Sequence, residues 1–368
     1  MKRWGMVGVL ILGLGWGLVS RAESGKTKLL LVDSYHREYL WSQFTNQGFA
    51  KGLLQFGYLD NQGQVEALLR DDAVESSKAV VKRLWMDTKR KSSEPEIAKL
   101  IPPVVAQVKA FALDLLFLAD DNAAHYIGSE FLDTDLPIVF WGINNTPVKY
   151  GLVDSPERPG HNVTGVVEVK YPMEALQLLK QLVPSAKTFA ILSDATDTGR
   201  SNAKAIEFLA RQGSLPLDLT ETVMTNEFEV FKQKALALQE AVDALFVMPT
   251  TSKDAQGQFI SDDAMMQWYM ANVRKPDVAF SRRGVVQGLL CAADSDGYSQ
   301  GFEGVRIAHD LLEGGKRPAT YATVTPKRGP LLVNRERARM LGITIPDGVA
   351  EEVIEEASAL KTVTKVKP

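Results

Sequence analysis

The feature that most limits the possible folds is a short apolar run that stops abruptly at polar and aromatic residues. Residues 28–32, KLLLV, predict a buried parallel strand, and Ser34, Tyr35 and His36 follow almost at once. A helix is predicted to begin near Ser42, a residue type that often caps helices. Open α/β sheets bind ligands at the carboxyl ends of their strands, so this junction predicts one wall of a binding cleft.

Strands and helices alternate in two series along the chain. In the first series, strands are expected at residues 28–32, 64–69, 113–118 and 137–140, and helices at 43–56, 74–86 and 94–111. In the second series, strands are expected at 188–192, 217–223, 244–248 and 278–281, and helices at 173–182, 199–212, 227–241 and 262–273. A helix at 298–312, a strand at 329–333 and a helix at 335–341 complete the pattern. We therefore predict an α/β fold of two doubly wound, parallel-sheet lobes joined by a hinge.

A stretch rich in proline and glycine, residues 144–161, lacks periodicity and predicts the connection between the lobes. We expect the first lobe to span 28–145, with a return segment at about 290–325. The second lobe is expected to span 162–285, with a C-terminal segment at about 326–360. Two lobes connected by more than one crossing of the chain predict a ligand cleft between them.

Residues 1–22 have the pattern of a cleavable signal peptide. Two basic residues precede an apolar stretch over 4–19, and the small residues Ser20 and Ala22 mark the cleavage site. The alternative is an uncleaved membrane anchor, but the apolar part is short for a span of about 20 residues. We therefore expect an exported protein that resides in the periplasm.

Charge and cysteine content exclude several classes of function. The formal net charge is −3, and no basic cluster suggests a nucleic-acid surface. Cys291 is the only cysteine, so no internal disulfide can form, and its apolar surroundings predict a buried side chain. We expect a monomer of ordinary globular composition.

Side chains at the predicted strand ends form the candidate ligand site. In the first lobe these are Ser34, Tyr35, Trp41, Asp121, Asn122, Trp141 and Asn144. In the second lobe they are Ser193, Asp194, Thr250, Thr251 and, after the returning apolar run, Asp294. A zwitterionic ligand needs hydroxyls, backbone N–H groups or helix N-termini for its anionic end and a carboxylate for its cationic end. The candidate set supplies both kinds of group.

The aromatic members of this set, Tyr35, Trp41 and Trp141, suit stacking on a planar ligand or a cation. For Trp41 the alternative is packing in the core of the first lobe. For Asp121 and Asp194 the alternative is helix capping, which is compatible with a place at the cleft.

Metal and cofactor binding are not indicated. His36 and His125 lack the spacing of metal ligands, and neither phosphate-binding glycine motif is present. Arg282 and Arg283 follow a predicted strand and suit an anionic ligand, although such a pair more often bridges nearby acids.

Residues 297–301, GYSQG, fit the G-x-S-x-G pattern of a hydrolase nucleophile. The preceding residues, 292–296, make a poor strand end, and the only downstream histidine, His309, lies in the same predicted helix. A catalytic base must reach the serine from a separate loop, so the geometry fails. We predict that the glycines mark a helix start and a close approach, and that the protein is not an enzyme.

Several segments taken in order carry a family resemblance. They are SYHREYLW, LADDNAAHYIG, LPIVFWGINNTPVKYG, NVTGV, and the late LLEGGKRP and LLVNRERARMLGITIP. This set resembles the periplasmic substrate-binding proteins of ABC transporters, in the type I group that includes tryptophan/tyrosine-type binding components. The resemblance implies a hinged two-lobed protein that closes on a small organic ligand, aromatic amino acids among the candidates, and delivers it to a membrane ABC permease. The SYHREYLW variant leaves a second role open, in which the protein senses a ligand as the partner of a histidine kinase.

Overall fold

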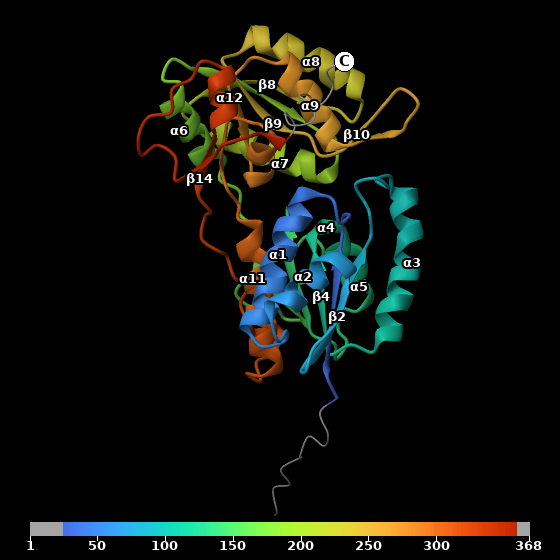
Figure 1. Cartoon of the computed structure of the whole chain (residues 1–368). Helices are drawn as coiled ribbons and strands as arrows, with labels where there is room; N and C mark the ends of the chain where they lie inside the picture. Colours follow the sequence, from blue (N-terminus) through green and yellow to red (C-terminus); the bar gives the residue numbers. More distant parts are fainter. Residues whose placement is uncertain (1–24, 359–368) are drawn as a thin grey trace, which may run out of the picture.

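The computed structural model describes residues 25–358 and contains two α/β lobes, each built on its own sheet (Figure 1). The first sheet has six strands in the order β2-β3-β1-β4-β5-β6, and the second has seven in the order β15-β14-β13-β12-β9-β7-β8. Most neighbouring strands are parallel, as expected for sheets covered by helices on both faces. The predicted fold class is confirmed.

The first lobe contains the early part of the chain. Its strands are β1 (Thr27–Asp33), β2 (Ala73–Glu75), β3 (Ala79–Trp85), β4 (Leu115–Ala119), β5 (Ile138–Ile143) and β6 (Val163–Val167). Its helices are α1 (Leu40–Gln55), α2 (Gln62–Asp71), α3 (Glu94–Phe111), α4 (Asp120–Asn122), the π-helix η1 (Ala123–Ile127) and α5 (Gly128–Glu130). Strand β4 is buried along its whole length, and Asp120, which follows it directly, is buried as well.

The second lobe contains most of the remainder. Its strands are β7 (Thr188–Ser193), β8 (Asp218–Met224), β9 (Ala244–Met248), β12 (Asp277–Ala279), β13 (Cys291–Ala293), β14 (Leu331–Asn334) and β15 (Glu352–Ile354), beside a hairpin of β10 (Ser252–Lys253) and β11 (Phe259–Ile260). Its helices are α6 (Pro172–Leu182), α7 (Asp197–Arg211), α8 (Phe228–Ala241), α9 (Asp262–Asn272), α10 (Arg282–Gln287) and α12 (Arg335–Met340). Cys291 is buried in this lobe, as predicted.

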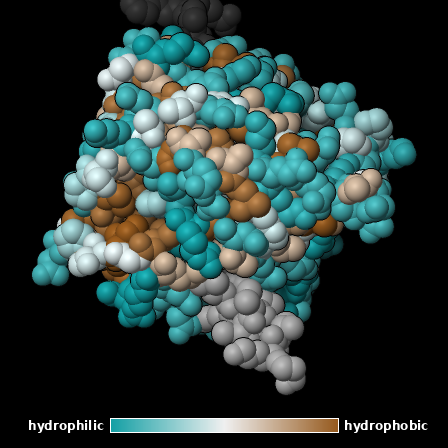
Figure 2. Space-filling model, turned by 90° about the horizontal axis from the view of Figure 1, so that it is seen from above, coloured by the Kyte–Doolittle hydropathy of each residue, from teal (hydrophilic) through white to brown (hydrophobic). Residues whose placement is uncertain are grey.

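Two further helical segments follow β13. They are α11 (Gly297–Leu312) and the 3-10 helix η2 (Pro318–Thr320). Figure 1 shows α11 lying beside α1 in the first lobe, far from the elements that precede it in sequence. Seen from the end of the second lobe, the surface is mainly hydrophilic, with hydrophobic areas gathered toward one side (Figure 2).

Two element assignments in the first lobe were wrong. Residues 64–69, predicted as a strand, lie in α2, where the buried side chains Val65 and Leu68 are three residues apart on one helical face. Residues 74–86, predicted as a helix, form β2 and β3 instead. The start of α1 also differs: it begins at Leu40, and Ser42 lies inside the helix, where its hydroxyl donates to Asp33 Oδ1 at 3.0 Å.

The lobe boundaries also differ from those expected. Strand β6 pairs with β5 in the first sheet, so the first lobe extends to Val167 rather than ending at 145. Strand β13 belongs to the second sheet, so the return to the first lobe starts with α11. The apolar run at 290 resembles a strand of either lobe, and only its pairing with β12 and β14 decides its place.

The chain passes between the lobes at residues 168–171, 294–296 and 325–330, which together form the connection between them. The first and third crossings are tied by the Val167 N–H, which donates to the Val324 carbonyl at 2.8 Å. The second and third are tied by the Gly329 N–H, which donates to the Asp294 carbonyl at 3.0 Å. These two hydrogen bonds therefore link all three crossings to one another.

Helix α11 approaches α1 closely through glycines. A Cβ atom on Gly48 would lie 1.8 Å from the carbonyl oxygen of Tyr298, and one on Gly301 would lie 2.0 Å from that of Thr45. Glycine at these positions is therefore a packing requirement. The GYSQG segment owes its last glycine to this contact, and the Ser299 hydroxyl donates to Asp296, the residue that caps α11.

Among residues 25–358, no helix combines the length and apolar character needed to cross a membrane. The predicted signal peptide lies outside the described residues.

Replacing Gly48 by alanine should separate α11 from α1, because the new methyl group would overlap a backbone oxygen that no rotamer change can move. We expect Gly48→Ala to lower the free energy of unfolding by about 1–3 kcal/mol or more, measured by urea titration. Gly63→Ala is the matched control, since only the Asn61 side chain would lie near the new methyl group, at 3.2 Å. Equal stability of the two variants would contradict this account of the packing.

Candidate functional site

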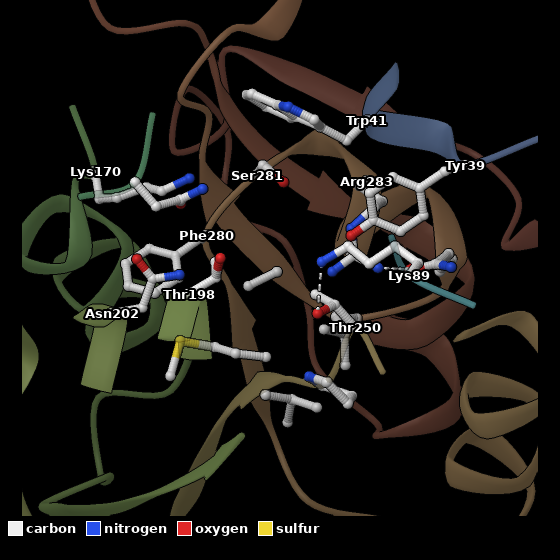
Figure 3. A pocket seen from close by; sticks show the side chains of 18 of the residues that line it. Tyr39, Trp41, Lys89, Lys170, Thr198, Asn202, Thr250, Phe280, Ser281 and Arg283 are labelled. Carbon is white, nitrogen blue, oxygen red and sulfur yellow. Dashed lines mark hydrogen bonds between the residues drawn. The ribbon is translucent and has the colours of Figure 1, made fainter. Parts of the chain in front are cut away.

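A cleft between the two lobes collects polar, charged and aromatic side chains (Figure 3). From the first lobe and the first crossing come Tyr35, Tyr39, Trp41, Lys89, Asp120, Asn144, Glu168 and Lys170. From the second lobe come Thr198, Asn202, Met248, Thr250, Phe280, Ser281, Arg283 and Gln287, among others. Most of these residues lie at the carboxyl ends of strands or at the starts of the following helices, where this sheet type places ligands.

Lys89 crosses the cleft from the first lobe. Its ammonium lies 4.3 Å from the ring centroid of Tyr35 and 5.2 Å from that of Tyr39, and donates to Thr250 Oγ1 at 3.0 Å (Figure 3). Burial lowers the pKa of Lys89. Among the described residues no carboxylate lies within ion-pairing distance of it, so this cation has hydrogen-bonding capacity left for an anionic group.

Asp120 is a buried carboxylate at the end of β4, with a positive φ of 68°. Its Oδ1 accepts a hydrogen bond from Trp41 Nε1 at 2.8 Å, while its buried Oδ2 has no partner among the described residues. Burial, followed by the charges of Asp33 and Glu168, raises the pKa of Asp120 well above its usual range. The neighbouring Gly142 is needed here, because a Cβ on it would lie 2.6 Å from Asp120 Oδ1.

Glu168 and Lys170 form an ion pair on the first crossing. The second oxygen of Glu168, Oε2, is buried without a hydrogen-bond partner among the described residues. The Lys170 ammonium lies 5.3 Å from the ring of Trp41 and 5.7 Å from that of Phe280. The crossing therefore brings a pair of opposite charges to the floor of the cleft, between aromatic groups of both lobes.

The wall from the second lobe is held by carboxylates behind it. Asp194 Oδ2 accepts from the backbone N–H of Thr250 at 2.8 Å and from its hydroxyl at 2.6 Å. Arg283 donates to Asp262 and to Gln287, both at 3.0 Å, and its guanidinium lies 5.3 Å from the ring of Tyr39 across the cleft. Asp194 thus orients Thr250 toward Lys89.

The space left among these side chains is only about 70 Å³. Sites for small organic ligands usually measure roughly 300–1,000 Å³. A ligand of amino-acid size would therefore need a wider separation of the lobes and different positions of the lysine side chains.

Four of the predicted site residues line the cleft: Tyr35, Trp41, Asn144 and Thr250. Another four stand behind the lining and position it: Ser34, Asp121, Asn122 and Asp194. For example, Asp121 accepts hydrogen bonds from the backbone N–H groups of Asn144 and Asn145. The alternative considered for Asp121 and Asp194 was helix capping. Both carboxylates instead accept hydrogen bonds from neighbouring loops and fix the positions of those loops.

The other four lie elsewhere. Trp141 is fully buried in the core of the first lobe, 5.7 Å from the ring of Phe49, because its side chain points to the face of β5 that α11 covers. Ser193 and Thr251 are buried in the second lobe and do not line the cleft. Asp294 lies in the second crossing, where it accepts a hydrogen bond from the Arg282 N–H at 2.9 Å.

Several lining residues were not predicted: Tyr39, Lys89, Glu168, Lys170, Asn202 and Phe280. Lys89 follows β3, which was predicted as a helix, and Glu168 and Lys170 follow β6, which was placed in the wrong lobe. Had both strands been assigned correctly, the rule that ligand sites lie at the carboxyl ends of strands would have identified Lys89, Glu168 and Lys170. Among residues 25–358 no group of histidine, cysteine or acidic side chains could hold a metal ion.

Replacing Asp120 by asparagine should stabilise the protein while keeping the acceptor for Trp41. The raised pKa means that the folded state holds this proton more tightly than the unfolded chain, so ionisation costs stability as the pH rises above about 4. We expect Asp120→Asn to be more stable than wild type by about 1–3 kcal/mol at pH 8, with a smaller difference at pH 4.5, in urea unfolding.

The adjacent Asp121→Asn variant is the control, because the Asp121 carboxylate accepts several hydrogen bonds, which stabilise its negative charge. This variant should be destabilised. A stability of Asp120→Asn that does not change relative to wild type between the two pH values would rule out the buried charge as the cause.

Comparison with known proteins identifies relatives of the whole fold. A family model described as ABC transporter substrate binding protein matches residues 47–357. A tyrosine-binding protein of Clostridioides difficile (strain R20291) is 25% identical over 209 residues. That match covers 56% of this chain and 57% of the relative, so the chain spans little more than half of the relative's length.

Solved structures share the architecture. The ABC domain in complex with L-Trp from Streptococcus pneumonia has a TM-score of 0.68 at 21% identity and covers 90% of this chain and 100% of that one. A conserved domain protein from Vibrio cholerae has a TM-score of 0.68 at 19% identity, with the same coverage. A ligand-free, open substrate binding protein with adhesive properties from Clostridium difficile has a TM-score of 0.60 at 19% identity, covering 89% and 99%. These likenesses show the type I periplasmic binding protein fold.

Proposed function

Because the chain belongs to the family of ABC transporter substrate-binding proteins, we propose that it closes on an aromatic amino acid and delivers it to a membrane ABC permease. We propose further that it is exported by its N-terminal signal and works in the periplasm. One observation carries the choice of ligand: the cleft combines incompletely paired buried charges of both signs with aromatic rings.

The charges of the cleft match those of a zwitterion. Asp120 Oδ2 and Glu168 Oε2 have no partner among the described residues, and the ammonium group of a ligand beside them would favour the ionised form of Asp120. Lys89, bonded only to a hydroxyl, suits the carboxylate. A hydrogen bond to a charged group contributes about 1.5–3 kcal/mol, and burial makes an unmet charge costly, so an uncharged ligand would bind poorly.

The rings of the cleft suit an aromatic side chain. Trp41 comes from the first lobe and Phe280 from the second, and both lie near Lys170. A planar ligand between them would contact both lobes at once. Such a ligand stabilises closure because it gains contacts that the open arrangement lacks. One relative is named for tyrosine and one solved relative contains L-Trp, which agrees with this ligand class.

Truncating the charge of Lys89 should weaken binding specifically. We expect L-tryptophan or L-tyrosine to raise the melting temperature of wild type, and Lys89→Met to bind it at least about tenfold more weakly in isothermal titration calorimetry. Lys91→Met, two residues along the same loop, removes a cation that does not line the cleft and should bind normally. Normal binding by Lys89→Met would refute the assignment of Lys89 to the ligand carboxylate.

Loss of the protein should reduce transport if the partner is a permease. We expect a strain lacking the gene to lose high-affinity uptake of radiolabelled L-tryptophan or L-tyrosine, and expression of the wild-type chain to restore it. Unchanged uptake together with a ligand-dependent kinase response would favour the sensing role instead.

A further inference from the structure

A second cavity, of about 440 Å³, lies against the crossings between the two lobes, where a hinge is expected, and we name it the hinge cavity. Its wall from the first lobe is formed by Trp41 and Phe44 of α1, and by Tyr298 of α11. Arg282 and Glu352 of the second lobe and Asp294, Asp296 and Pro330 of the crossings complete it. The cavity therefore has an aromatic side and a charged side, and it touches both lobes.

The charged side is acidic on balance. Arg282 is already engaged, since its two terminal nitrogens donate to the two oxygens of Glu352 at 2.6 Å each, and its Nε lies 3.5 Å from Asp294 Oδ2. Asp296 accepts from the N–H and hydroxyl of Ser299 and has no cationic partner among the described residues. Three carboxylates face one guanidinium, so the cavity favours a cation over an anion.

The aromatic side is suited to the body of such a cation. Tyr298 is 42% exposed and Phe44 is half-buried, so neither is committed to the core. Aromatic faces attract an ammonium group and bury apolar carbon. A small amine with an aromatic body would satisfy both sides of the cavity.

Trp41 and Ser281 line this cavity and also the cleft described above. On the cleft side, Trp41 Nε1 donates to Asp120. An occupant of the hinge cavity would hold Trp41 in this position and would bridge the two lobes in their present arrangement. The cleft leaves only about 70 Å³ in this arrangement, so an occupant of the hinge cavity should oppose binding of a larger ligand in the cleft, and the opposition should be reciprocal.

We propose that the hinge cavity is a second binding site, which takes a small aromatic amine and holds the lobes in the present narrow arrangement, against binding of a ligand in the cleft. The second site stands on its own cavity, while its effect on binding in the cleft rests on the function proposed above.

The probe for the site is 2-phenylethylamine, with 3-phenylpropionate as the anion of similar shape. We expect isothermal titration calorimetry to show binding of the amine and none of the acid. Phe44→Ala should weaken amine binding about tenfold or more, whereas Asp120→Asn, which alters only the cleft side, should leave it unchanged. Phe208→Ala is the control, because Phe208 is an exposed aromatic residue of α7 that does not line the hinge cavity.

Absence of amine binding would overturn the proposal, and so would equal binding of amine and acid. Loss of amine binding in Asp120→Asn but not in Phe44→Ala would also overturn it, by placing the amine in the cleft. With saturating amine, the affinity for L-tryptophan should fall about threefold or more, and an unchanged affinity would contradict the coupling. If L-tryptophan itself fails to bind, the failure concerns the function proposed above, and the amine titrations still decide the second site.

Discussion

The binding cleft depends on buried charges that the protein does not fully pair. Asp120 and Glu168 each keep one carboxylate oxygen without a partner among the described residues, and Lys89 reaches only a hydroxyl and two rings. In the second lobe, by contrast, Arg337 and Asp277 are both fully buried and bonded to each other. Incompletely paired buried charges lower the stability of the fold, and such a cost is expected where a protein binds a ligand.

The three crossings between the lobes explain how one chain builds a cleft from two separate sheets. The first crossing follows β6, the second follows β13 and the third leads into β14, and backbone hydrogen bonds link the crossings to one another. Lys170 and Glu168 sit on the first crossing and line the cleft, so a change in the angle between the lobes would move both charges. The packing of α11 on α1 through Gly48 and Gly301 joins a late segment of the chain closely to the first helix of the first lobe.

Much of the fold could be predicted because most buried strands are continuous apolar runs. The errors came where that signal fails. Strand β3 alternates buried and exposed residues, and β6 is a short run after a proline-rich stretch, so its sheet is fixed only by pairing with β5. Local sequence likewise cannot tell that Trp141 points into the core, because that depends on α11, which arrives over 150 residues later.

The placement of α11 also has a consequence for how the molecule acquires its structure. The core of the first lobe includes Val305, Ile307, Ala308 and Leu311 beside residues from its opening strands. A nascent chain that ends before α11 leaves this hydrophobic surface uncovered. Because contacts so distant in sequence form slowly, the first lobe should complete its folding only once the last fifth of the chain, which begins with α11, is available.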